Sequence, residues 1–202
     1  MTPLPDHLLE SFAAEAVREG LADALFSVVD TPIGRLVIVQ GGHGIVRIGF
    51  EAGEGDALLA GVAGVLGPRV LRSERELGAA RDAVSAYLEG DDEELDLPVD
   101  LALVRSPFRR TVLEHLRRVP RGTTVSYGAL ALAAGNPKAA RAVGSACATN
   151  PIPLLVPCHR VLPGTGRVGN YGLGGPAVKT RLLQMEGALD QPPLTGPRTD
   201  SL

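Results

Sequence analysis

Three stretches in the first half of the chain place apolar residues at the three- and four-residue spacing of an amphipathic helix. Residues 6–20 do so with Asp6 in position to cap the first turn. Residues 55–66 and 74–89 follow the same spacing. We therefore expect a helix in each of these stretches.

Three runs of extended, mostly apolar sequence lie between the first two of these helices, at residues 24–29, 35–40 and 45–50. Short segments rich in glycine and other turn formers separate them. Because such short connections join antiparallel neighbours, the pattern predicts an antiparallel meander. An exposed acidic turn is expected at Asp91–Glu94, followed by an extended segment or linker over residues 95–104.

The second half reads as a series of helices. Ser106-Pro107 starts the first, whose apolar stripe continues to Pro120. Ser126 can cap a second helix, and the breaker Gly135-Asn136-Pro137 separates it from a third over Lys138–Cys147. Two helices joined by a three-residue turn are typical of a helix-turn-helix.

The composition is that of an ordinary globular protein: 202 residues, 45% apolar and 21% charged. No apolar run is long enough to cross a membrane, and the acidic N-terminal residues do not fit a secretory signal. Two cysteines do not make a disulfide scaffold, so a reducing, cytoplasmic setting is expected. Aromatic residues are only 3%, which argues against stacking platforms for single-stranded nucleic acid.

A charge asymmetry changes this ordinary picture. Residues 1–103 carry 19 Asp and Glu against 7 Arg, a balance of −12. Residues 104–202 carry 4 acidic against 13 basic residues, a balance of +9. A basic half suits a polyanion such as nucleic acid. Two plainly solvated surfaces would explain the same numbers, so charge alone leaves both interpretations open.

The helix expected over Lys138–Cys147 is built mainly from small residues, with Arg141 in its middle. It lacks the long polar side chains that read base edges in a major groove. If this helix contacts DNA, the pattern favours a fit to shape with a protruding arginine. An alanine-rich helix packed against the core is the alternative.

The candidate chemistry lies in residues 150–163, where four prolines restrict the backbone. A stretch that is expected to be buried ends in Cys158-His159-Arg160. A neighbouring base or cation raises the thiolate fraction of a cysteine, so the tripeptide indicates an activated nucleophile. A buried cysteine that serves only as a small apolar residue is the competing interpretation.

Here the sequence resembles a known family. Val156–Val161 is similar to the active-site signature of the O6-alkylguanine-DNA alkyltransferases. The resemblance extends from about Phe26 to Ala188; it is strong from Ser106 onward and weaker before it, where Thr31–Gly34 agrees. Further blocks fall in the family's order: Val125–Gly128, Asn136–Gly144, Asn150-Pro151, Val168–Tyr171 and Leu182–Gly187.

The resemblance implies an α/β (α+β) protein. Residues 1–103 would form an RNase H-like domain, a small antiparallel sheet with helices and an extra N-terminal helix. Residues 104–190 would form a mostly helical DNA-binding and alkyl-transfer domain with the helix-turn-helix, and residues 191–202 a flexible tail.

The implied function is direct DNA repair. The alkyl group of O6-alkylguanine, and of O4-alkylthymine, in double-stranded DNA would pass irreversibly to Cys158, one group per protein molecule. The helix-turn-helix would bind the minor groove and the damaged base would be flipped out. No cofactor or metal is implied, and we expect a monomer in solution that can bind DNA cooperatively.

By the same resemblance, Cys158 is the nucleophile and His159 its base, acting through a water molecule. Glu186, in a helix beginning near Pro176, would orient His159. Asn150 corresponds to a hinge asparagine between the recognition helix and the active-site segment. Tyr127 would help to rotate the nucleotide and protonate the departing guanine.

Arg141 resembles the arginine that fills the gap left by the flipped base. The resemblance also implies DNA contacts from the same helix, at Lys138, Ala139, Ala140 and Gly144. The residues expected to line the alkyl pocket are Pro153, Tyr171, Gly172 and Val161.

The sequence departs from some relatives in ways that bear on function. Its first half has no cysteine, and His7 and His43 alone cannot complete a tetrahedral zinc site, so we expect no zinc there. Ala148 and Thr149 stand where some relatives carry a basic residue. The loop over residues 172–176 is one residue longer, which puts the width of the pocket in question.

Three other classes compete with this interpretation. A cysteine hydrolase would draw its histidine from a distant segment, because adjacent Cys and His side chains do not readily form a dyad. A DNA-damage binder without transfer activity would have lost the reactive thiol, whereas Cys158 is present. A helix-turn-helix regulator would need polar base readers, which residues 138–147 lack.

Overall fold

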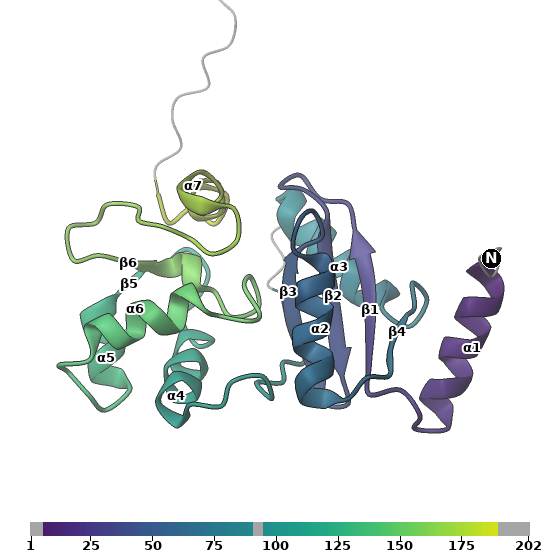
Figure 1. Ribbon diagram of the computed structural model, residues 1–202. Coiled ribbons are helices and arrows are strands. Elements are labelled where there is room, and N and C mark those ends of the chain that lie inside the picture. The colour runs from purple at the N-terminus through teal and green to yellow at the C-terminus, as the bar shows by residue number, and fades with distance from the viewer. Residues whose placement is uncertain (1–5, 91–94, 190–202) are drawn as a thin grey trace, which may run out of the picture.

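The computed structural model describes residues 6–90 and 95–189, and its centre is a mixed four-stranded sheet (Figure 1). Strands β1 (Ala24–Val29), β2 (Leu36–Gly41) and β3 (Gly44–Phe50) form the expected antiparallel meander. A short strand β4 (Val70–Arg72) was not predicted and pairs with β1 in parallel, giving the order β3-β2-β1-β4. The expectation of a purely antiparallel sheet is therefore corrected at this edge.

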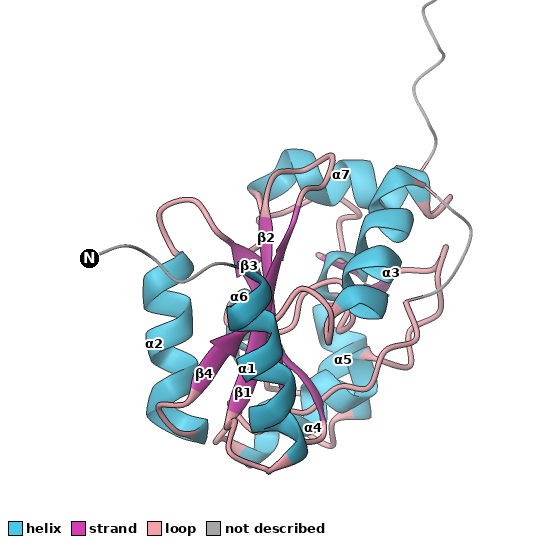
Figure 2. Cartoon of the chain, turned by 90° about the vertical axis from the view of Figure 1, so that its right-hand side faces the viewer, coloured by secondary structure: helices cyan, strands magenta, loops and turns pink. Residues whose placement is uncertain are grey.

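Helices cover both faces of the sheet. Helix α2 (Gly55–Leu66) lies on one face and α3 (Gly78–Glu89) on the other (Figure 2). Alternate residues of β2 supply the two faces: Val37 and Val39 pack with α2, whereas Leu36 and Ile38 belong to the cluster on the α3 side. Helix α1 (Asp6–Arg18), two residues shorter than expected, lies beside β4.

The second half consists of short helices joined by two short strands. Its helices are α4 (Pro107–Leu116), α5 (Tyr127–Ala133), α6 (Ala140–Ala148) and α7 (Gly175–Met185). Strands β5 (Val125–Ser126) and β6 (Val161–Leu162) pair in parallel, and β6 follows a 3₁₀ turn, η1 (Cys158–Arg160). Helices α5 and α6 form the predicted helix-turn-helix.

Helix starts in this half follow local signals in the sequence. The Ser106 and Ser126 hydroxyls accept hydrogen bonds from the backbone N–H of Arg109 and Ala129, as expected for N-caps. Helix α6 begins two residues later than expected, because the backbone N–H of Ala139 still closes a turn on the Asn136 carbonyl.

A single apolar core joins the two halves. The cluster on the α3 side of the sheet continues without a break into α4, α5, α6 and the segment that carries Cys158. Edge strand β3 lies nearest to the second half, and the Ile48 N–H donates to the Pro151 carbonyl at 2.9 Å. A shared apolar core of this kind fixes the halves relative to each other.

Two expectations fall on residues outside this description: the acidic turn at Asp91–Glu94 and the tail at 191–202. Within residues 6–90 and 95–189, no helix combines the length and the apolar character that a membrane crossing requires.

Candidate active site

The segment that delivers Cys158 is buried without interruption from Pro151 to Val161. The Asn150 side chain holds it in shape: its Oδ1 accepts from the Ile152 N–H at 3.0 Å, and its Nδ2 donates to the Val156 carbonyl at 2.8 Å. The same Nδ2 lies 3.1 Å from the Cys158 sulfur. Asn150 therefore fixes the fold of the segment and the position of the thiol together.

The thiol of Cys158 is nearly sealed from solvent, with 4% of the residue exposed. Burial raises its pKa to about 11, although the Asn150 hydrogen bond and the positive charge of Lys179 act in the opposite direction. At neutral pH the group is therefore a protonated thiol. A nearby base has to remove its proton before the sulfur can act as a nucleophile.

That base can be His159, the next residue along the chain, which is fully buried. Its Nε2 lies 2.9 Å from the Glu186 Oε1, and burial lowers its pKa. Because the neighbouring carboxylate is ionised, Nε2 carries the proton and Nδ1 keeps its lone pair. Nδ1 makes no hydrogen bond to the described residues, so it is the ring nitrogen that can accept a proton.

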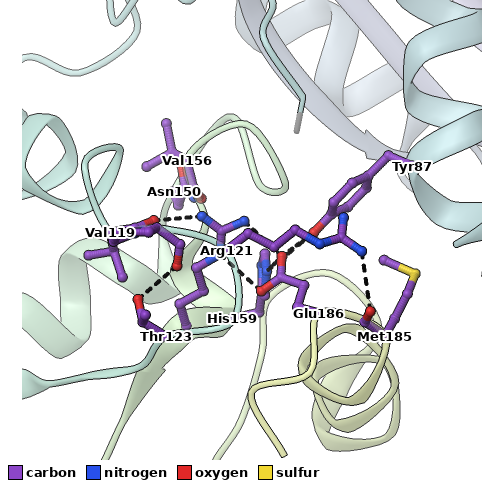
Figure 3. A network of polar contacts seen from close by, with 11 residues as sticks. Tyr87, Val119, Arg121, Thr123, Asn150, Val156, His159, Met185 and Glu186 are labelled. Carbon is purple, nitrogen blue, oxygen red and sulfur yellow. Dashed lines mark hydrogen bonds and ion pairs between the residues drawn. The ribbon is translucent and has the colours of Figure 1, made fainter. Parts of the chain in front are cut away.

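Glu186, the residue directly after α7, is a buried carboxylate that accepts hydrogen bonds from several side chains (Figure 3). Arg160 donates from Nε to Oε2 at 3.0 Å and from Nη2 to Oε1 at 2.8 Å. Tyr87 donates from Oη to Oε1 at 2.5 Å, beside His159. Burial alone would raise the pKa of Glu186, but the hydrogen bonds, foremost those of His159 and Arg160, outweigh it and lower the pKa to about 2.

Lys179 provides a second buried charge near the thiol. Only 1% of the residue is exposed, and its Nζ donates to the Val161 carbonyl at 2.6 Å. Burial lowers its pKa, while the neighbouring cysteines act in the opposite direction. Its charge lowers the pKa of Cys158, so it favours the thiolate.

Two cavities on different sides are lined in part by Cys158. One of about 380 Å³ opens between the helix-turn-helix and the loop before α7; among its lining residues are Tyr127, Gly144, Tyr171 and Gly172. The other, of about 350 Å³, lies against β3 of the sheet and is lined in part by Phe50, Asn150, Pro153 and Gly172.

The structure thus brings most of the predicted site together around one sulfur. Val161 is the exception among the pocket residues, because it is fully buried in β6 and lines neither cavity. Arg141 on α6 is exposed, and so is Lys138, which lies two residues before that helix begins. Ala139, Ala140 and Gly144 are half-buried.

Three residues of the site were not singled out for a role from the sequence: Tyr87, Arg160 and Lys179. The sequence indicates Arg160 only as a neighbour that activates the thiol, whereas in the structure it pairs with Glu186. The spacing of Lys179 and Glu186, two helical turns apart, gave a usable signal that they share one face of α7. No local signal marks Tyr87, which stands among apolar residues in α3.

Comparison with known proteins shows that both halves of the chain match domains of the same protein family. Residues 24–101 match the family model described as the ribonuclease-like domain of 6-O-methylguanine DNA methyltransferase. Residues 107–188 match the model of the DNA binding domain of the same proteins. Together the two matches cover most of the chain.

Individual relatives agree with the family models. The methylated-DNA–protein-cysteine methyltransferase of Homo sapiens is 39% identical over 180 residues, spanning 84% of each chain. The bifunctional transcriptional activator/DNA repair enzyme Ada of Escherichia coli is 36% identical over 163 residues, which cover 80% of this chain and 45% of Ada.

Among solved structures, Mycobacterium tuberculosis O6-methylguanine methyltransferase is similar, with 32% identity and a TM-score of 0.67 over 82% of this chain and 93% of that one. The structure of Mycobacterium tuberculosis OGT in complex with DNA is similar to the same degree, with 32% identity and a TM-score of 0.67 over 81% of this chain and 93% of that one.

Proposed function

Because the chain belongs to the 6-O-methylguanine DNA methyltransferase family, we propose that it repairs double-stranded DNA by moving the alkyl group of O6-alkylguanine onto Cys158. One observation carries the assignment of Cys158. This buried cysteine lines two cavities, and the next residue is a histidine whose Nε2 is fixed by Glu186 and whose Nδ1 can take a proton.

The proposed reaction is a displacement at a saturated carbon. The thiol proton moves through a water molecule to His159 Nδ1, the sulfur attacks the alkyl carbon, and the bond from that carbon to guanine O6 breaks. The electron pair of the broken bond stays on guanine, which takes a proton from the Tyr127 hydroxyl. The proton held by His159 then restores the phenol through solvent.

The surroundings of each group support these roles. Burial raises the pKa of Tyr127, so its hydroxyl remains protonated and able to donate at neutral pH. Glu186 accepts the Nε2 proton and stabilises the imidazolium that forms when Nδ1 is protonated. The product is a thioether, which water does not cleave readily, so each molecule should react once.

Base flipping is proposed because the reacting atom of the lesion lies in a stacked base pair, whereas Cys158 is buried and lines a cavity. Tyr127 at the start of α5 and Gly144 on α6 line the cavity that a flipped base would enter. The small residues of α6 let its backbone approach the minor groove closely, and Arg141 is exposed on the same helix.

Transfer from a duplex oligonucleotide with a labelled O6-methyl group tests the function. We expect the label to appear on the Cys158 peptide, with a plateau at one methyl group per protein molecule, and O4-methylthymine to serve as a second, separately tested donor. Retained binding to the lesion without transfer would instead indicate a DNA-damage binder, and release of label into solution with turnover would contradict single use.

Replacing Arg141 by alanine should slow transfer from duplex DNA more than transfer from free O6-methylguanine base. Flipping costs a few kcal/mol, and an inserted arginine offsets part of it, so we expect a loss of roughly tenfold on duplex. Single-turnover rates at saturating protein separate this step from binding. Arg118→Ala, which removes another exposed charge of the same half, is the control; an equal loss on both substrates would exclude a role in flipping.

A further inference from the structure

Glu186, in the second half of the molecule, accepts a hydrogen bond from Tyr87 in the first half. Tyr87 lies on α3, which packs against the sheet of the first half, and is 3% exposed. Its hydroxyl donates to Glu186 Oε1 at 2.5 Å and lies 3.4 Å from His159 Nε2. The other donors to this carboxylate, His159 and Arg160, both come from η1 in the second half.

The tyrosine ring is fixed in this position by its own neighbours. The guanidinium of Arg121 lies over the ring, 5.8 Å from its centre, and donates to the Met185 carbonyl, one residue before Glu186 (Figure 3). Burial raises the pKa of Tyr87 well above its ordinary value, with the charge of Glu186 acting in the same direction. The hydroxyl is therefore a proton donor throughout the working pH range.

Three donors share Glu186 Oε1: His159, Arg160 and Tyr87. Each hydrogen bond to a carboxylate oxygen offsets part of the negative charge of that oxygen. Each donor therefore weakens the hydrogen bonds that the same oxygen accepts from the other donors. The Tyr87 hydroxyl also fixes Oε1 in place beside Nε2. It can thus affect the reacting histidine without touching the thiol or the substrate.

We infer that Tyr87 is a positioning residue for alkyl transfer, which through Glu186 aligns His159 and limits how strongly the carboxylate stabilises the protonated imidazole. This inference rests on the proposed function of Cys158 and His159. The proton affinity of His159 then depends on the packing of the first half against the second, because the Tyr87 hydroxyl reaches Glu186 only when α3 is in place.

The pH dependence of His159 is set by groups from every element packed around it. Tyr87 approaches from α3, and Arg121 from the turn after α4. The remaining titratable or charged groups come from η1, the loop before α7, and α7 with its terminal residue: Cys158, Arg160, Tyr171, Lys179 and Glu186. Deleting a single uncharged oxygen atom is enough to remove the hydrogen bond from Tyr87 to Glu186.

Tyr87→Phe deletes that oxygen and keeps the ring. Without this oxygen, Glu186 stabilises the protonated imidazole more strongly, so the pKa of His159 should rise. Because the reaction needs neutral His159, we expect the low-pH limb of the transfer rate to move upward by about half a pH unit or more. The rate should fall several-fold on the low-pH limb and change little at pH 9.

Val84→Ala is the matched control, because it removes fully buried methyl groups from the same helix and keeps the hydroxyl. It should lower the midpoint of urea unfolding without moving the pH midpoint of transfer. A Tyr87→Phe variant that behaves like Val84→Ala, or like the unchanged protein, would overturn the inference.

A second readout does not depend on transfer. NMR titration of the histidine ring nitrogens should show His159 protonating at higher pH in Tyr87→Phe than in the unchanged protein. If the unchanged protein transfers no alkyl group, the proposed function fails, while this titration still decides whether Tyr87 tunes His159. An unchanged titration together with normal transfer would reject only the role of Tyr87.

Discussion

Cys158→Ala is expected to abolish alkyl transfer completely while leaving duplex DNA binding intact. The sulfur is the only atom of the side chain that can form the new bond to carbon, and alanine offers no nucleophile in its place. Alanine is smaller than cysteine, so the buried segment around it can keep its fold. Single-turnover transfer and a binding titration with the same lesion-containing duplex measure the two properties separately.

Cys147 provides the control within the same site. It is buried, lines both cavities beside Cys158, and has a pKa that burial raises to about 12. It lies one residue before the end of α6, without a following histidine. We expect Cys147→Ala to retain transfer; if that variant were the inactive one, the nucleophile would be misassigned.

Glu186→Gln should damage both stability and reaction rate. The change removes the charge that compensates the buried guanidinium of Arg160, which is 4% exposed. Breaking such a pair typically costs about 3–5 kcal/mol, because the remaining charge stays buried without its partner. The imidazolium of His159 also loses its stabilising carboxylate, so transfer should slow by about a hundredfold or more.

The pH dependence of unfolding distinguishes this charge effect from a packing defect. The folded-state pKa of Glu186 is about 2, below the ordinary 4.5, so its stabilising contribution is complete above pH 4.5. That contribution is lost progressively as the pH falls from 4.5 toward 2. The difference in unfolding free energy between the unchanged protein and Glu186→Gln should shrink over this range, as measured by urea unfolding at pH 7 and pH 3.

Glu51→Gln is the surface control, because Glu51 pairs with Arg35 where both side chains are substantially exposed. Exposed pairs contribute about 0–1 kcal/mol, so this variant should unfold almost like the unchanged protein. If the two variants lost the same amount of unfolding free energy, the buried charge of Glu186 would contribute no more to stability than an exposed one.

Local signals in the sequence were enough to place most elements. Ser106 and Ser126 were recognised as caps because an N-cap depends on a hydroxyl and the next three residues. The meander was recognised because its turns are short, so neighbouring strands are also neighbours in the chain. The Cys158 segment stood out for the same reason: its prolines and its Cys-His-Arg end are contiguous.

Features that depend on distant residues were not predicted. Strand β4 has three residues and pairs with β1 in parallel across an intervening helix, which leaves no turn signal between partners. The Tyr87–Glu186 contact joins residues 99 positions apart, and nothing in α3 distinguishes this tyrosine from a core aromatic. The family resemblance supplied roles for His159 and Glu186. The structure adds two further donors to Glu186, Arg160 from the same half and Tyr87 from the other half.

The opposite charges of the two halves give the rigid molecule an electric dipole. The basic end carries the helix-turn-helix and the acidic end carries the sheet, and the shared core prevents them from turning independently. Near a polyanion, the field exerts a torque that brings the basic end forward, over a distance of about 8–10 Å at physiological salt. We expect encounters with DNA in which the basic end leads to be favoured over those in which the acidic end leads.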